Sequence, residues 1–172
     1  MSQYDESLFR AELSSRYHRR RATFLERSAL MMTLLTLIGG GSGVISLFGD
    51  GKIIAQVSAG IVTLVGLIQI VYRPEMAAMQ HKAWLRRWNK VIIEIKFEST
   101  SPHDKALEVQ WAREAANIES ECVGEMRALQ ADCYNRAVRY MNIDAGNNYE
   151  LRWYHRALCQ IVSFEHGFEA RA

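Results

Sequence analysis

Charge is missing from two long stretches of this chain, residues 28–48 and 53–72, which only Gly49-Asp50-Gly51-Lys52 separates. A helix of about 20 apolar residues crosses a hydrocarbon core of about 30 Å. The buried helix of a soluble protein rarely lacks Lys, Arg, Asp and Glu over such a length, and two neighbours that both lack them are rarer still. The missing charge therefore argues against a soluble fold and predicts two membrane-spanning helices.

Cysteines and catalytic motifs are also scarce. The three cysteines, Cys122, Cys133 and Cys159, lack the paired spacing of a metal site. On one helix the first two would lie about 16 Å apart, which is too far for a disulfide. The sequence contains no H-E-x-x-H, C-x-x-C or G-x-S-x-G motif, and its histidines are scattered. We therefore expect no catalytic residue, no metal and no cofactor, in a reducing cytoplasmic setting.

The turn between the apolar stretches is so short that the two helices must be antiparallel neighbours, a helical hairpin. Basic residues crowd both outer flanks of this hairpin, whereas the turn offers only Lys52. The positive-inside rule then predicts a multi-pass protein of the inner (cytoplasmic) membrane with both termini in the cytoplasm. A cleaved signal peptide is not expected, because a polar segment as long as a helix precedes the first apolar stretch.

Nucleic-acid binding is not indicated. From Arg73 onward the chain carries equal numbers of basic and acidic residues. Arginine and tryptophan beside a membrane span favour either the lipid headgroup region or a helix–helix core, and His18 next to the arginine run is expected at the surface. The residues assigned as membrane-interface anchors are Arg19, Arg20, Arg21, Arg27, Tyr72, Arg73, Trp84, Arg86, Arg87 and Trp88.

Small and weakly polar residues recur at three-and-four spacing along each predicted span. They are Thr33, Thr36, Gly40 and Gly43 in the first, and Gln56, Ala59, Thr63 and Gly66 in the second, with Gln69 further along. Small residues let helix backbones approach closely, and Gly39 and Gly43 also form a G-x-x-x-G pair. Two interpretations stay open, packing within the hairpin and the lining of an oligomeric pore, because an amide that faces lipid is costly.

The predicted fold is an all-α membrane protein. An N-terminal amphipathic helix (1–27) precedes the transmembrane hairpin (28–72, with spans 28–48 and 53–72), and a cytoplasmic helical region (73–172) follows it. In that region we expect helices over 75–97, 102–141 and 149–165 that form a helical bundle or coiled coil. Gly124 is the weakest point of the longest helix, which would bend there, pack against the last helix or pair with another subunit.

This order of elements, with Tyr17-His18-Arg19-Arg20-Arg21-Ala22 before the first span, resembles the SLATT family over nearly the whole chain. SLATT proteins are two-transmembrane effector domains associated with bacterial nucleotide-signalling conflict systems. The resemblance implies a membrane-embedded effector that oligomerises and breaches the inner membrane when a partner detects infection. The implied partner is a nucleotide-signalling enzyme, a nucleotide-sensing protein or a reverse transcriptase. The family supplies no catalytic motif.

Three functions remain open from the sequence. The first is a pore-forming effector of an anti-phage system, and the second is a holin-like or exclusion membrane protein of a phage or prophage. The third is a membrane-anchored scaffold that conducts no ions. Holins are usually shorter outside their spans, which disfavours the second function, and conductance in liposomes would separate the third from the other two.

Overall fold

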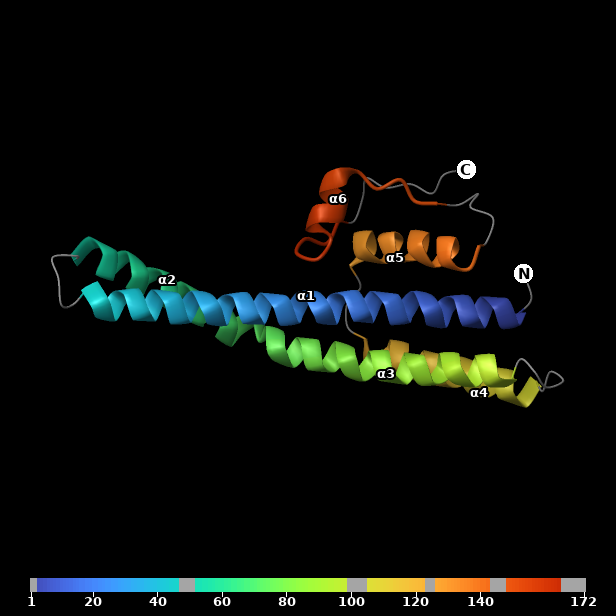
Figure 1. Cartoon of the computed structure of the whole chain (residues 1–172). Coiled ribbons are helices and arrows are strands. Elements are labelled where there is room, and N and C mark those ends of the chain that lie inside the picture. Colours follow the sequence, from blue (N-terminus) through green and yellow to red (C-terminus); the bar gives the residue numbers. More distant parts are fainter. Residues whose placement is uncertain (1–2, 47–51, 99–104, 123–125, 143–147, 165–172) are drawn as a thin grey trace. The chain divides into compact units, whose positions relative to one another are not determined.

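The computed structural model describes residues 3–46, 52–98, 105–122, 126–142 and 148–164, and these residues fold into α-helices without any β-strand (Figure 1). The expectation of an all-α fold is confirmed. The helices are α1 (Gln3–Ser46), α2 (Lys52–Tyr72), α3 (Pro74–Glu98), α4 (Lys105–Glu121), α5 (Arg127–Tyr140) and α6 (Trp153–Leu158).

The chain divides into two compact units. One unit comprises Met1–Arg21 and His81–Ala172, and we call it the helical module. The other comprises Ala22–Gln80, and we call it the hairpin segment. Helices α1 and α3 each contribute residues to both units.

Helix α1 is continuous through the boundary that the sequence analysis placed between residues 27 and 28. No proline occurs in α1, and its first glycine is Gly39, so nothing in the backbone ends the helix where its composition changes from polar to apolar. Asp5 and Glu6 in the first turn suit the positive end of the helix dipole. Composition thus changes along this helix while its backbone conformation does not.

Arg73 forms the link between α2 and α3. Its φ of 41° lies in the left-handed region, in part because the following Pro74 disfavours a helical conformation there. Its N–H donates to the carbonyl of Gln69 (3.0 Å) and its carbonyl accepts from the N–H of Ala77 (3.1 Å), so the hydrogen-bond ladder continues on both sides. The chain therefore turns at Arg73 without leaving these two backbone groups unpaired.

The long helix expected over 102–141 is instead two helices, α4 and α5. Gly124, the expected weak point, lies outside the described residues, but the chain is already extended at Met126, whose φ is −83° and ψ is 99°. The N–H of Met126 donates to the hydroxyl of Tyr17 (3.1 Å), which holds the start of α5 against α1. The interruption lets α4 and α5 pack in different hydrophobic clusters, which one straight helix does not allow.

The last helix is also shorter than the expected 149–165, because α6 covers only Trp153–Leu158. The side chain of Asn135 donates to the carbonyl of Tyr149 (2.7 Å) and accepts from its N–H (2.8 Å). These two bonds pair the backbone N–H and carbonyl of Tyr149, so Tyr149 needs no helical partner for either group. After α6 the chain turns, with the N–H of Ile161 bonded to the carbonyl of Leu158 (2.9 Å).

Two hydrophobic clusters form the core of the helical module. The first joins α1, α3 and α4 and contains Ala11, Trp84, Trp88, Val91, Ile92, Ile95, Trp111, Ala115 and Ile118. The second joins α1 and α5 with the C-terminal end of α6 and contains Tyr17, Ala128, Leu129, Cys133 and Cys159. The amphipathic helices of the sequence thus bury their apolar faces against α1.

The hairpin segment has little buried surface. The structure contains two helical stretches, Asp5–Gly41 and Ala55–Phe97, that are long and apolar enough to cross a membrane. In the most apolar window of each, only 17% and 11% of the residues are buried. The core helix of a soluble protein buries such a window, so the exposed apolar surface distinguishes these helices from ordinary core helices.

Candidate functional site

Helices α1 and α2 lie close together at Gly39. A Cβ atom added there would lie 2.7 Å from Cγ2 of Val62, so no larger residue fits without displacement. The same test at Gly40 and Gly66 finds open space. Packing within the hairpin, one of the two interpretations that the sequence leaves open, therefore does not involve Gly40 or Gly66 here, whereas Gly39 contacts α2. The surroundings of Gly43 lie outside what the structure describes.

The buried residues of α2 identify the face that packs against α1. Ser58 and Val65 are buried, and Val62 lies between them in contact distance of α1. The stripe predicted from the sequence, Gln56, Ala59, Thr63 and Gly66, is one position away around the helix. Gln56, Ala59 and Thr63 are exposed, and Gly66 has free space where a side chain would stand. The predicted stripe is therefore left uncovered by its own chain.

Hydroxyl groups in the hairpin segment bond to their own helices. Thr33 donates to the carbonyl of Ala29 (3.0 Å), Thr36 to that of Met32 (3.0 Å) and Thr63 to that of Ala59 (2.8 Å). A threonine with this bond leaves no unpaired donor toward lipid. Among the predicted polar positions, the amides of Gln56 and Gln69 are thus the groups that an apolar environment penalises most.

The two tryptophans assigned as membrane anchors are core residues of the helical module. Trp84 and Trp88 are 7% and 1% exposed and pack between α1 and α4. The anchor assignment is therefore wrong for both residues. Their spacing of four residues matches one face of a helix, which fits burial against a neighbouring helix as well as it fits a headgroup layer.

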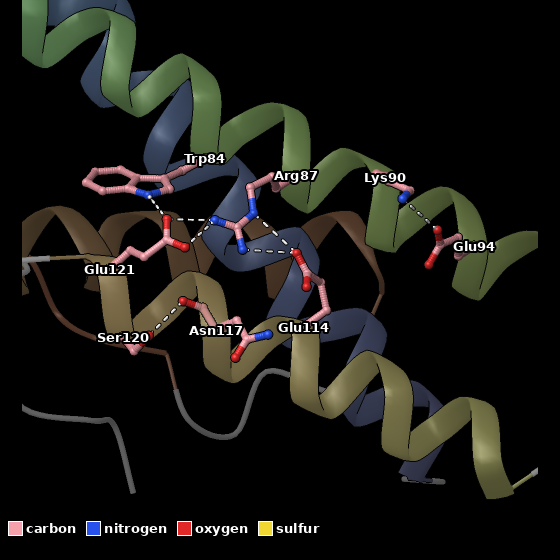
Figure 2. A network of polar contacts seen from close by, with 8 residues as sticks. All are labelled: Trp84, Arg87, Lys90, Glu94, Glu114, Asn117, Ser120 and Glu121. Carbon is pink, nitrogen blue, oxygen red and sulfur yellow. Dashed lines mark hydrogen bonds and ion pairs between the residues drawn. The ribbon is translucent and has the colours of Figure 1, made fainter.

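Arg87, another assigned anchor, ties α3 to α4 (Figure 2). Its guanidinium group pairs with Glu121 (2.6 Å) and with Glu114 (3.1 Å), and the indole N–H of Trp84 also donates to Glu121 (3.3 Å). Hydrogen bonds from Arg87 and Trp84 lower the pKa of Glu121. These contacts give Arg87 a structural role, while its neighbour Arg86 is exposed.

The arginine run before the first span joins α1 to α5 and to the residues that directly follow α6. Arg20 pairs with Asp132 on α5, a carboxylate that is only 5% exposed and that also accepts from Nε of Arg136 (3.2 Å). Arg21 donates to the backbone carbonyl of Gln160. Arg20 and Arg21 are therefore engaged inside the module rather than presented to lipid. Of the remaining assigned anchors, Arg19, Arg27, Tyr72 and Arg73 are exposed.

A pair formed by the buried His18 and the half-buried His81 escaped the sequence analysis. Nδ1 of His18 lies 2.9 Å from Nδ1 of His81, and Nε2 of His18 lies 3.7 Å from Sγ of Cys122. His18 is only 5% exposed, so its expected surface position is wrong. Burial lowers the pKa of His18 to about 4, helped by His81, and lowers the pKa of His81 to about 4, helped by Arg21.

The sequence does contain a signal for the burial of His18. Buried positions along α1 include Ala11, Ser15, His18, Ala22 and Leu25, which follow the three-and-four spacing of one helix face. That face mixes small and polar residues with apolar ones, so hydrophobicity alone did not reveal it. Small residues on a helix face indicate close packing as clearly as large ones do.

The histidine pair does not form a metal site. In the part of the chain that the structure describes, no group of three or more His, Cys, Asp or Glu side chains is placed to hold a metal. The thiol of Cys133 is buried, and burial raises its pKa to about 11, which makes it a poor nucleophile at neutral pH.

Comparison with known proteins does not extend this picture, because no protein-family model, curated protein or solved structure matches the chain significantly.

Proposed function

We propose that this chain is a membrane-embedded effector that assembles as a homo-oligomer and permeabilises the bacterial inner membrane on a signal from a partner protein. The observation that supports membrane insertion best is the exposed apolar surface of α1 and α2. Leu37, Ile53 and Val71 are 72%, 76% and 86% exposed. Hydrocarbon is the environment in which such a surface carries no hydrophobic penalty.

The uncovered stripe of α2 supports assembly. Two helices enclose no aqueous path, so conduction requires several copies of the hairpin around an axis. Gly66 offers space for the close approach of another helix, and Gln56 and Thr63 lie about two helical turns apart on the same stripe. In this arrangement the second span lines the pore, and Gln56 gains water or a partner in place of lipid.

The proposed topology keeps both termini in the cytoplasm. Arg27 and Arg73, at the inner ends of the two spans, are exposed, and only the short turn near Lys52 reaches the opposite side. The helical module then meets cytoplasmic signals. The resemblance to SLATT proteins supplies the setting, defence against phage, and the class of partner, a nucleotide-signalling enzyme, a nucleotide-sensing protein or a reverse transcriptase.

A non-conducting scaffold is the second candidate. It is favoured by the threonine hydroxyls, which already bond within their helices and need no wet lumen. In this reading the stripe on α2 serves only contacts between copies, and Gln56 hydrogen-bonds across that contact.

Substitution of Gln56 separates the two candidates. Cells that express the chain with its natural trigger are loaded with a membrane-potential dye, and assembly is read by crosslinking. For a pore, Gln56→Leu abolishes depolarisation and leaves the oligomer intact, whereas for a scaffold the same change weakens the oligomer. Val57→Leu, on a neighbouring exposed position, is the matched control and should change neither. A wild-type chain that is monomeric and leaves the potential unchanged would refute the pore.

A further inference from the structure

A pocket of about 410 Å³ opens in the hairpin segment beside the link between α2 and α3. Thr33 of α1 and Gln69 of α2 form part of its wall, and Arg73, Glu75 and Met76 come from the link and the first turn of α3. In the proposed topology this link lies where the second span leaves the membrane, at the level of the lipid headgroups. The pocket is therefore placed where a phospholipid presents its polar end.

Charges of both signs line the pocket. Arg73 and Glu75 are both exposed and stand on either side of the buried Pro74. The left-handed conformation of Arg73 and the fixed φ of Pro74 set the direction in which the chain leaves this point. A ligand that carries a phosphate and a nearby cation matches this pair, because the guanidinium group of arginine binds phosphate and a carboxylate binds an ammonium group.

The remaining wall is apolar. Ile70 is 68% exposed and Met76 is 63% exposed, and both line the same pocket. The unbranched Met side chain adapts to irregular apolar partners such as an acyl chain. Gln69 also lines the pocket and carries an amide N–H₂ that can donate to an ester carbonyl.

We propose that this pocket binds a phospholipid with a primary ammonium headgroup, phosphatidylethanolamine, an inference that rests on the membrane insertion in the proposed function. Arg73 binds the phosphate, Glu75 accepts hydrogen bonds from the ammonium group, and Gln69 donates to the glycerol ester. The first part of one acyl chain lies on Ile70 and Met76. An anionic lipid such as phosphatidylglycerol binds less well, because its headgroup has no cation to offset Glu75. Phosphatidylcholine binds less well, because its quaternary nitrogen has no N–H to donate.

The test uses the full chain in nanodiscs that contain equal amounts of phosphatidylethanolamine, phosphatidylglycerol and phosphatidylcholine. Native mass spectrometry of the released protein counts the lipids of each class that stay bound. We expect phosphatidylethanolamine to be retained in preference to the other two. Arg73→Gln should reduce its retention about tenfold, the effect of losing one charge-assisted hydrogen bond. Glu75→Gln should remove the preference over phosphatidylglycerol.

Arg27→Gln and Glu26→Gln are the matched controls, because they remove the same charges at positions that do not line the pocket. Arg73→Lys keeps a cation and should keep the preference for phosphatidylethanolamine. This variant shows whether the loss in Arg73→Gln comes from the missing charge or from misfolding at the link. Equal retention of the three lipids, or equal effects of Arg73→Gln and Arg27→Gln, overturns the lipid site while leaving membrane insertion intact. A chain that does not enter nanodiscs at all overturns both the insertion and the site.

Discussion

The helical module and the hairpin segment share the two long helices α1 and α3, but the module buries its large apolar side chains whereas the hairpin segment exposes most of its own. In the module, Trp88, Ile118 and Leu129 are at most 1% exposed. In the hairpin segment, Leu37, Ile53 and Leu64 are 60% exposed or more. Helix α1 belongs to both regions, so its first half has the residue pattern of a water-soluble protein and its second half that of a membrane span.

The polar groups of the two regions differ in the same way. In the module, Arg20 and Arg87 reach other helices and pair with carboxylates. In the hairpin segment, Thr33 and Thr63 bond to the carbonyls of their own helices. In lipid an unpaired hydroxyl is costly, and a bond to the carbonyl of its own helix removes that cost. The comparison indicates that the module is suited to water and the hairpin segment to lipid, and the following predictions test this difference.

The largest effect is expected in the core of the module. Trp88→Ala should destabilise the module by about 3–5 kcal/mol, because it empties a fully buried aromatic site between α1, α3 and α4. Thermal unfolding followed by circular dichroism measures this loss. Trp88→Phe is the control and should cost less, because the ring is kept and the indole N–H has no acceptor among the described residues. Equal losses for the two variants would contradict the burial of Trp88.

The second-largest effect is expected when arginine is introduced at one exposed position in each region. Leu64 of α2 and Val109 of α4 are 60% and 58% exposed, so neither site is crowded. Leu64→Arg should oppose insertion by about 2.5–3.5 kcal/mol, since it places a charge in the middle of a span. Val109→Arg should leave the protein in the membrane fraction, because its site faces water. Carbonate extraction of membranes reads the outcome, and tolerance of Arg at both sites would show that the hairpin segment is not in lipid.

A smaller effect concerns the helix contact inside the hairpin. Gly39→Val places methyl groups where Val62 already stands and should cost about 1–3 kcal/mol of hairpin stability. Gly40→Val adds the same atoms in open space and should cost little. The separation of α1 and α2, measured between spin labels at exposed positions, should increase only in the Gly39 variant. An increase in both variants would place the contact elsewhere.

The smallest expected effect is a pH dependence confined to the module. The pKa values of His18 and His81 are lowered to about 4, so the unfolded chain binds protons more readily than the folded one between pH 6.5 and 4. Stability should be constant above pH 6.5 and fall as the pH drops toward 4, by on the order of 1 kcal/mol after allowance for partial exposure.

Melting curves at pH 7.5 and pH 5 measure this fall, and His81→Gln should reduce it because one of the two titrating groups is gone. A wild-type melting temperature that does not change between these pH values would show that the two rings are accessible to water in the folded protein. The hairpin segment contains no histidine within residues 22–80, so its helices should not respond in this range.

Local patterns in the sequence determined much of the secondary structure and the division of the chain. The uncharged stretches indicated two helices long and apolar enough to span a membrane, and the structure contains them. Trp111, Ala115 and Ile118 are spaced four and three residues apart along α4, the spacing of one helix face, and all three are buried. Such features depend on the residues of one element, which is why composition and periodicity reveal them.

Only the tertiary structure decided which neighbours each face meets. Trp84 and Trp88 became core residues, Arg20 found Asp132, and His18 met His81, because residues far apart in the sequence share the same contacts. Gly39 rather than Gly40 carries the hairpin contact, since rotation of a helix by one residue, about 100°, moves a position from contact to open space. A pattern of small residues indicates that a helix packs closely, but the partner helix sets which residue makes the contact.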